Sequence, residues 1–259
     1  MGDPELIPDD EIDIALRSAE AVGRRMIALS AVAHRVGVQP NEEPDDEDDD
    51  PSGLTDEVEE RLDWLAWLAD HSLLDALTAA ERALLDTGDE SLGDDDRDDQ
   101  ATALESLGAL AWAVNRSGLT VLDRGYPYQR LLDGVPSPWQ EPRPFLDVLT
   151  VRAEAEIATA RDAAELLSWR AQVEVERRAA GPREAAEIED AIRDVAKELV
   201  EAGLAPVGPD GDLLIGGEPI RSLDDGIVVS MAAAARARLR AISWLCGLGD
   251  WDDPALVEI

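Results

Sequence analysis

The sequence predicts an all-α protein, mainly helical, with one small β-hairpin near residues 212–220. Through most of the chain, apolar residues recur three and four positions apart, which is typical of helices that pack on one face. Two Ser/Thr-x-x-acid motifs precede apolar runs, as capping boxes do. Only 212–220 reads as strand: Gly216-Gly217 predicts a tight turn, and Pro219 restricts the second arm to a sheet edge.

The first predicted helix is the most regular. We expect Asp9 or Asp10 to cap its start, where a carboxylate meets the positive end of the helix dipole, and Gly37 to end it. Its apolar stripe comprises Ile12, Ala15, Ala19, Val22, Met26, Leu29, Ala33 and Val36. Because several of these are alanine, a partner helix could approach closely.

Two acidic segments interrupt the helices. Residues 39–53 contain no apolar anchor and a block of like charge, so we expect an acidic disordered loop there, and we expect a second acidic disordered loop over 87–100. Between them lie two predicted helices, one from about Thr55 and one opened by the capping box Thr78-x-x-Glu81. A further helix carries Leu104, Leu107, Ala111 and Val114.

The second half of the chain begins with a segment rich in proline and glycine. Its density of breakers over 123–144 predicts no regular helix and is where a sub-boundary would fall within a single helical domain spanning 1–259. A long helix over about 150–180 should follow, ended by Gly181-Pro182, and then a helix ending near Gly203. Ser222-x-x-Asp225 predicts the start of the last helix, which carries Val228, Met231, Ala235, Leu239, Ile242 and Cys246.

The charge balance is extreme. Fifty-eight acidic residues face 23 basic ones, of which only Lys197 is lysine, and the formal net charge is −35. Such a charge opposes compaction by self-repulsion, and concentrated salt screens that repulsion. We therefore expect a cytoplasmic protein from a salt-accumulating organism such as a haloarchaeon, with a high-GC bacterium as the alternative.

The same composition excludes several classes of function. A chain without a basic footprint is not expected to bind nucleic acid or an anionic membrane. No signal peptide opens the sequence, and its apolar runs are too short to span a bilayer. Cys246 alone forms neither a disulfide nor a zinc site, and it is expected to be a buried, inert thiol. We expect no cofactor and no metal.

The C-terminal segment carries a family resemblance. Residues 238–253 read Arg-Leu-Arg-Ala-Ile-Ser-Trp-Leu-Cys-Gly-Leu-Gly-Asp-Trp-Asp-Asp, which resembles the closing motif of the family called domain of unknown function 4272. Segments 24–32, 67–68, 77–81, 105–112 and 152–170 fit the same family in the same order, although Ser168 stands where the family has histidine. The resemblance implies a helical fold and an intracellular protein, and it supplies no catalytic residue.

The Trp-Asp-Asp segment is the main candidate site. Asp250, Asp252 and Asp253 surround Trp251 just past a helix end, and such carboxylates suit Mg²⁺ or Ca²⁺. The alternative is that they form ion pairs with Arg238 or Arg240 while Trp251 packs as a lid. With the other residues of the family-like segments, the candidate cluster comprises Arg24, Arg25, Trp169, Arg170, Arg240, Trp244, Asp250, Asp252 and Asp253.

Two functions remain open. The sequence has no nucleophile elbow or phosphate loop, and His34 and His71 have no metal-ligand spacing. We therefore expect a protein-interaction or accessory module that uses a helical face and exposed aromatics between Tyr126 and Phe145 to bind an unknown protein partner. Alternatively, that segment seals the core, and the protein binds a small molecule or divalent cation, or is a hydrolase-like enzyme, at the Trp-Asp-Asp segment. A concave pocket where arginine and aspartate converge favours the second function.

Overall fold

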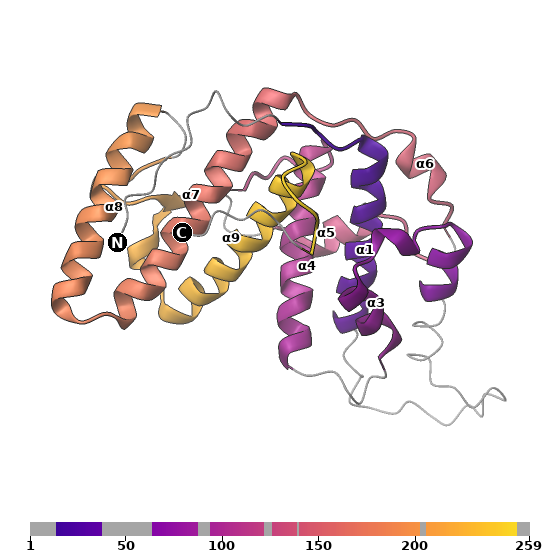
Figure 1. The fold of residues 1–259 in the computed structure, drawn as a ribbon, viewed down its shortest axis with the longest axis horizontal. Helices are drawn as coiled ribbons and strands as arrows, with labels where there is room; N and C mark the ends of the chain where they lie inside the picture. Colours follow the sequence, from indigo (N-terminus) through magenta and orange to yellow (C-terminus); the bar gives the residue numbers. More distant parts are fainter. Residues whose placement is uncertain are drawn as a thin grey trace.

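A computed structural model describes residues 14–37, 64–87, 94–121, 126–138, 140–202 and 206–252, and it confirms the mainly helical class. Five long helices form a row (Figure 1). In order along the row they are α1 (Ala19–Gly37), α4 (Asp94–Ala113), α9 (Asp225–Leu245), α7 (Glu154–Ala179) and α8 (Pro182–Ala202). The row does not follow chain order, because the last helix, α9, lies between α4 and α7.

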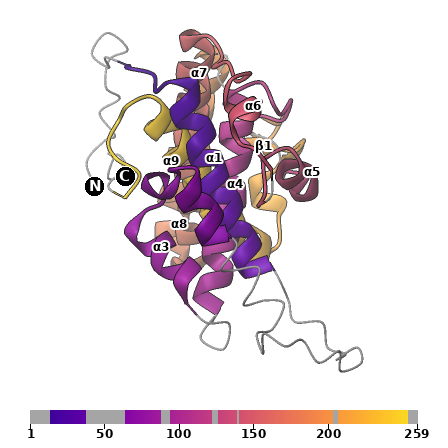
Figure 2. The same cartoon turned by 90° about the vertical axis from the view of Figure 1, so that its right-hand side faces the viewer.

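Short elements cover the α1 end of the row (Figure 2). They are the helical residues 64–70, the 3-10 helix η2 (Leu74–Ala76), α3 (Ala79–Asp86), α5 (Tyr128–Asp133) and α6 (Arg143–Leu146). At the other end, β1 (Leu214–Ile215), β2 (Glu218–Pro219) and the 3-10 helix η4 (Ile220–Ser222) lie between α8 and α9 along the chain. The predicted hairpin is confirmed, since Leu214 pairs antiparallel with Pro219 and both turn glycines have positive φ.

Two groups of buried apolar residues form the core. The larger group joins α1, α4, the C-terminal half of α9 and the first turns of α7, and it contains Trp64, Trp67, Trp112, Trp244 and Trp251. The smaller group joins the middle of α7, the hairpin and the N-terminal half of α9. Because α7 and α9 contribute to both, these two helices connect the two ends of the molecule. We call the larger group of buried residues the tryptophan core and the smaller group the hairpin core.

The predicted start of the first helix is wrong. Residues 14–18 are not helical, and α1 begins at Ala19. The backbone amides of Ala15 and Arg17 instead donate to the carbonyls of Cys246 and Leu245 at 3.1 and 2.9 Å. Those carbonyls lie at the end of α9 and lack helical partners. Asp9, Asp10 and Ile12 lie outside the described residues, whereas the predicted end at Gly37 is confirmed.

The acidic loop predicted over 87–100 is also wrong in its second half, because α4 begins at Asp94. Asp94, Asp95 and Asp96 occupy its first turn, where the helix dipole favours negative charge over the repulsion that predicted a loop. Similarly, α5 forms inside the segment predicted to lack helix. The loop predicted over 39–53 lies outside the described residues.

One capping box is confirmed and one is wrong. Thr78 accepts from the amide of Glu81 at 3.1 Å, and the Glu81 carboxylate accepts from the amide of Thr78 at 2.9 Å. Ser222, by contrast, belongs to η4, and its hydroxyl donates to the carbonyl of Pro219 at 2.7 Å. The N-cap of α9 is Asp224, without a side-chain cap bond.

Candidate functional site

The C-terminal end of α9 forms the base of the Trp-Asp-Asp segment. The amide of Gly247 donates to Trp244 O and that of Leu248 to Ser243 O, both at 3.0 Å, which is the Schellman arrangement. Gly247 has φ +76°, and a Cβ there would lie 2.7 Å from the carbonyl oxygen of Ala15. Only glycine therefore fits where residues 14–18 cross the end of α9.

Arg17 fixes the same junction from the N-terminal side. Its Nε donates to Trp244 O at 2.8 Å and its Nη2 to Gly249 O at 3.0 Å. The guanidinium carbon lies 4.6 Å from the centre of the Trp244 ring, and Nη2 lies 3.7 Å from Asp250. Since the Asp250 side chain is 92% exposed, this ion pair adds little stability.

Arg25 is the buried cation of the segment. Its two terminal nitrogens bind the Glu81 carboxylate at 2.7 and 2.5 Å, and Nη1 also donates to Ala76 O. Its guanidinium carbon lies 3.8 Å from the centre of the Trp251 ring, which meets Trp244 edge-on at 5.4 Å. Burial lowers the pKa of Arg25, and the hydrogen bond to Glu81 opposes that shift. Arg17, Arg25, Glu81, Trp244 and Trp251 form what we call the tail cluster.

The other predicted members lie around this cluster with different partners. Arg24 binds Asp75 and the carbonyl of Ser72, at the surface. The Arg240 side chain has a buried Nε and makes no hydrogen bond or ion pair with any described residue. The Asp252 side chain is exposed. Asp253 lies outside the described residues. Within the described residues, no group of three or more His, Cys, Asp or Glu side chains could hold a metal ion.

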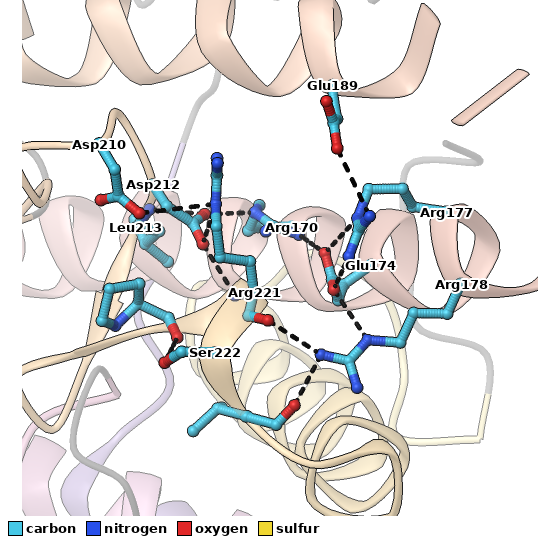
Figure 3. A network of polar contacts seen from close by, with 12 residues as sticks. Arg170, Glu174, Arg177, Arg178, Glu189, Asp210, Asp212, Leu213, Arg221 and Ser222 are labelled. Atoms are coloured by element: carbon cyan, nitrogen blue, oxygen red, sulfur yellow. Dashed lines mark hydrogen bonds and ion pairs between the residues drawn. The ribbon is translucent and has the colours of Figure 1, made fainter. Parts of the chain in front are cut away.

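Trp169 and Arg170 do not join the tail cluster. Both lie in the middle of α7, beside the hairpin core, and Arg170 is the first member of a second polar group there (Figure 3). That group, which we call the hairpin network, comprises Arg170, Glu174, Arg177, Arg178, Asp212 and Arg221.

The hairpin network joins α7 to Asp212 just before β1, to η4 and to the start of α9. Asp212 is fully buried, and its carboxylate accepts from Arg170 Nε at 2.7 Å and from the amide of Arg221 at 2.8 Å. Arg178 reaches from α7 to the carbonyl of Leu223 at 2.7 Å and to the carboxylate of Asp225. These bonds hold the hairpin and the first turn of α9 against one face of α7.

Glu174 is the centre of this network. Its side chain has no exposed surface and accepts from Arg170, Arg177 and Arg178 at 2.7 to 3.0 Å. Burial alone would raise the pKa of Glu174, but hydrogen bonds from Arg177 and Arg178 and the charge of Arg170 lower it to about 2. Glu174 therefore remains ionised and holds three cations together.

A small cavity lies beside the network, between α7 and α8. Its volume is about 10 Å³, enough for about one water molecule. It is lined by Leu166, Trp169, Arg170, Ile192, Val195, Ala196 and Leu213. A cavity of this size does not admit a metabolite unless α8 moves away from α7.

The aromatic segment mostly seals the core. The Tyr126 ring is buried, lies 4.7 Å from the guanidinium of Arg238 and packs where a side chain on Gly108 would collide with it. Among the described residues, Arg238 pairs with the buried Glu105, to which its Nε donates at 2.7 Å, and not with Asp250 or Asp252. Tyr128 is partly exposed but donates its hydroxyl proton to Glu105 at 2.6 Å. Trp139 lies outside the described residues.

One open helix face carries little charge. Along the first three turns of α9, one side is exposed and presents Gly226, Val229, Ser230, Ala233 and Arg236, which we call the α9 face. Val229 is 60% exposed, and the adjacent Ile227 is 38% exposed. No acidic residue occurs anywhere in 226–249, although the chain has 58. The sequence analysis did not single out this face.

The sequence analysis also missed several residues of the tail cluster and of the hairpin network, although the spacing of charged residues could have identified some of them. Arg170, Glu174 and Arg178 follow one another at i,i+4 spacing, which predicts ion pairs on a helix. Arg17 had no such signal, because its partners lie 227 and 232 residues away in the sequence, and the pair of Arg170 with Asp212 had none because 42 residues separate them.

Comparison with known proteins places the chain in a family. No curated protein and no solved structure matches it. None of the described helices is long and apolar enough to cross a membrane. The model of one family, described as domain of unknown function (DUF4272), matches residues 3–254, which include the Schellman end of α9, the tail cluster and the hairpin network. The chain therefore belongs to the DUF4272 family.

Proposed function

We propose that this protein is a protein-interaction or accessory module that docks a partner on the α9 face and works in the cytoplasm of a salt-accumulating organism. The observation that carries the proposal is an exposed, acid-free helix face on a chain of net charge −35. Exposed valine and isoleucine beside small residues give a surface on which an apolar partner can pack.

The contrast with α8 supports this surface. The exposed side of α8 carries Arg183, Glu184, Glu187, Glu189, Asp190, Arg193, Asp194 and Lys197. A charged face of this kind is most stable in contact with water, whereas burial of the α9 face against a partner lowers the free energy. Concentrated salt screens contacts between charges but leaves apolar contacts intact, so a docking face with Arg236 as its one charged residue suits the proposed environment.

The candidate residues of the tail cluster favour a structural role over chemistry. Arg25 of α1 binds Glu81 of α3, and Arg17 binds the end of α9. Trp244 and Trp251 pack edge to face in the same core. Charges that are paired inside a filled core fit an interaction module better than an open catalytic pocket.

A site-specific photo-crosslinker at position 229 tests the proposal in cells of the source organism. We expect a discrete adduct at 229 and none at 187, an exposed position on α8 that serves as the control. The partner recovered from the adduct, once purified, should bind the wild-type chain and lose at least about tenfold in affinity to Val229→Asp. Equal labelling at the two positions, or no adduct at 229, contradicts the proposal.

Arg240 favours a second candidate, binding of a small anionic molecule beside the tail cluster. It is a part-buried cation without an ion-pair partner among the described residues, and its charge lies close enough to that of Arg25 for the two cations to repel each other. A thermal-shift screen of carboxylates, phosphates and divalent cations tests this candidate, since a native-state ligand raises the melting temperature. A selective shift that disappears in Arg240→Gln supports it, and no shift from any compound excludes it.

A further inference from the structure

The spacing of the residues on the α9 face is the same when it is read from either end of the helix. Gly226, Val229, Ala233 and Arg236 are separated by three, four and three residues, so they lie in one stripe. A two-fold axis through the middle of this stripe places each position opposite one of the same set in an antiparallel copy. Val229 then faces Ala233 of the second copy, and Gly226 faces Arg236.

The facing positions complement one another in size. Val229 is the large apolar residue of each pair, and Ala233 offers the space to receive it. Gly226 likewise leaves room for the stem of Arg236. Small residues let two helix axes approach to about 8 Å, and the 3-4 spacing corresponds to packing at a shallow crossing angle.

The facing positions also complement one another in charge. Asp225 directly precedes Gly226, and its side chain is 90% exposed although it accepts a bond from Arg178. Arg236 makes only a 3.2 Å hydrogen bond to Gln172, at the surface. In the antiparallel arrangement, each Arg236 lies within reach of the carboxylate of Asp225 on the other copy. Two identical ion pairs would then flank the apolar centre, as an isologous interface requires.

We propose that the partner seated on the α9 face is a second copy of this chain, in an antiparallel, two-fold symmetric α9–α9 dimer. The inference rests on the proposed function, because it names the occupant of the same face. A helix face of this size buries less than the roughly 1,200 Å² of a stable interface, so the dimer is weak. Because each chain carries −35 charges, long-range repulsion opposes the dimer in dilute buffer, and salt should strengthen it.

Sedimentation velocity of the purified chain, from about 10 to 500 µM in dilute buffer and in molar KCl, tests the proposal. We expect a dimer fraction that rises with concentration and with KCl. Val229→Asp should raise the dissociation constant at least about tenfold, because it brings two carboxylates into the apolar centre. Val148→Asp is the matched control, because Val148 is 61% exposed but lies outside α9.

Two further variants test the register. Arg236→Asp should weaken the dimer, and Asp225→Arg combined with Arg236→Asp should restore it, with circular dichroism confirming that each variant folds. Independently, a chain carrying Val229→Cys mixed with one carrying Ala233→Cys should form a disulfide faster than either chain alone, since the native Cys246 is buried.

Three outcomes overturn the inference: a monomer at every concentration and salt, a dimer that Val229→Asp and Val148→Asp weaken equally, or cysteine pairs that do not follow the predicted register. A monomeric chain whose position-229 crosslinker still captures another protein refutes the second copy but leaves the docking function standing. A dimer with the predicted register supports the inference even if no other protein is captured.

Discussion

The tryptophan core and the hairpin core are stabilised by different forces, although α7 and α9 run through both. The tryptophan core is large and apolar, and its buried charges form separate ion pairs, Arg25 with Glu81 and Arg238 with Glu105. The hairpin core is small and depends on the fully buried carboxylates Glu174 and Asp212, surrounded by arginines. The comparison shows that a short hairpin with little apolar surface can be fixed to a helix by a paired polar network, provided that every buried charge has a partner.

Loss of the central carboxylate should separate the two regions most strongly. Glu174→Gln leaves Arg170, Arg177 and Arg178 without their shared anion, so we expect a loss of about 3–5 kcal/mol in unfolding free energy. Hydrogen exchange should rise in 206–223 and at the start of α9, while α1 and α4 remain protected. Glu184→Gln, at an exposed position on α8, is the control. An equal rise in hydrogen exchange in the hairpin region and in α1 and α4 would show that the two cores unfold as one unit.

The reverse effect is expected from the tryptophan core. Trp251→Ala removes the ring between Arg25 and Trp244 and should reduce stability by about 3 kcal/mol. Exchange should now rise at the end of α9 and in residues 14–18 rather than in the hairpin. Tryptophan fluorescence and urea unfolding measure the loss. A change below about 1 kcal/mol would show that Trp251 lies on the core without stabilising it.

Acid should act on the hairpin core first. The pKa of Glu174 is lowered to about 2 in the folded protein, so its contribution is present above its unfolded pKa of about 4.3 and is lost as pH falls toward 2. The shift corresponds to about 3 kcal/mol. Urea unfolding at pH 6, 4 and 3 should show this loss in the wild type and a smaller one in Glu174→Gln. Parallel pH profiles for the two proteins would assign the acid sensitivity to other carboxylates.

The smallest expected effect is at the junction of residues 14–18 with α9. Gly247→Ala places a methyl group against the carbonyl of Ala15 and strains a positive φ, which should lower stability by about 2 kcal/mol. Gly181→Ala is the control, because a Cβ there meets nothing within 4 Å and its φ is not positive. Thermal unfolding of the two variants measures the difference. An equal change in both would mean that residues 14–18 yield without cost.

The long helices, the hairpin turn and the Thr78 cap were predictable because each depends on residues close together in the sequence. The start of α1 was not, since residues 14–18 bind the end of α9 rather than extend their own helix. In the candidate site, Arg25 and Trp244 come together as expected, but Arg170 lies in the other core. Spacing along one helix cannot show which distant segment packs on it. The contact of Asp212 with Arg170 is therefore evident only from the structure.

The crossing of residues 14–18 over the end of α9 also determines when these residues can reach their native contacts during synthesis. Arg17 binds Trp244, which is 227 residues later in the chain. At a translation rate of about 5–20 residues per second, that partner is made on the order of 10–45 s after Arg17. During this interval Arg17 and Ala15 have no native place to dock, and α1 must pack on α4 without them. The contact between residues 14–18 and α9 therefore forms only after α9 is made, and a nascent chain stopped before α9 lacks it.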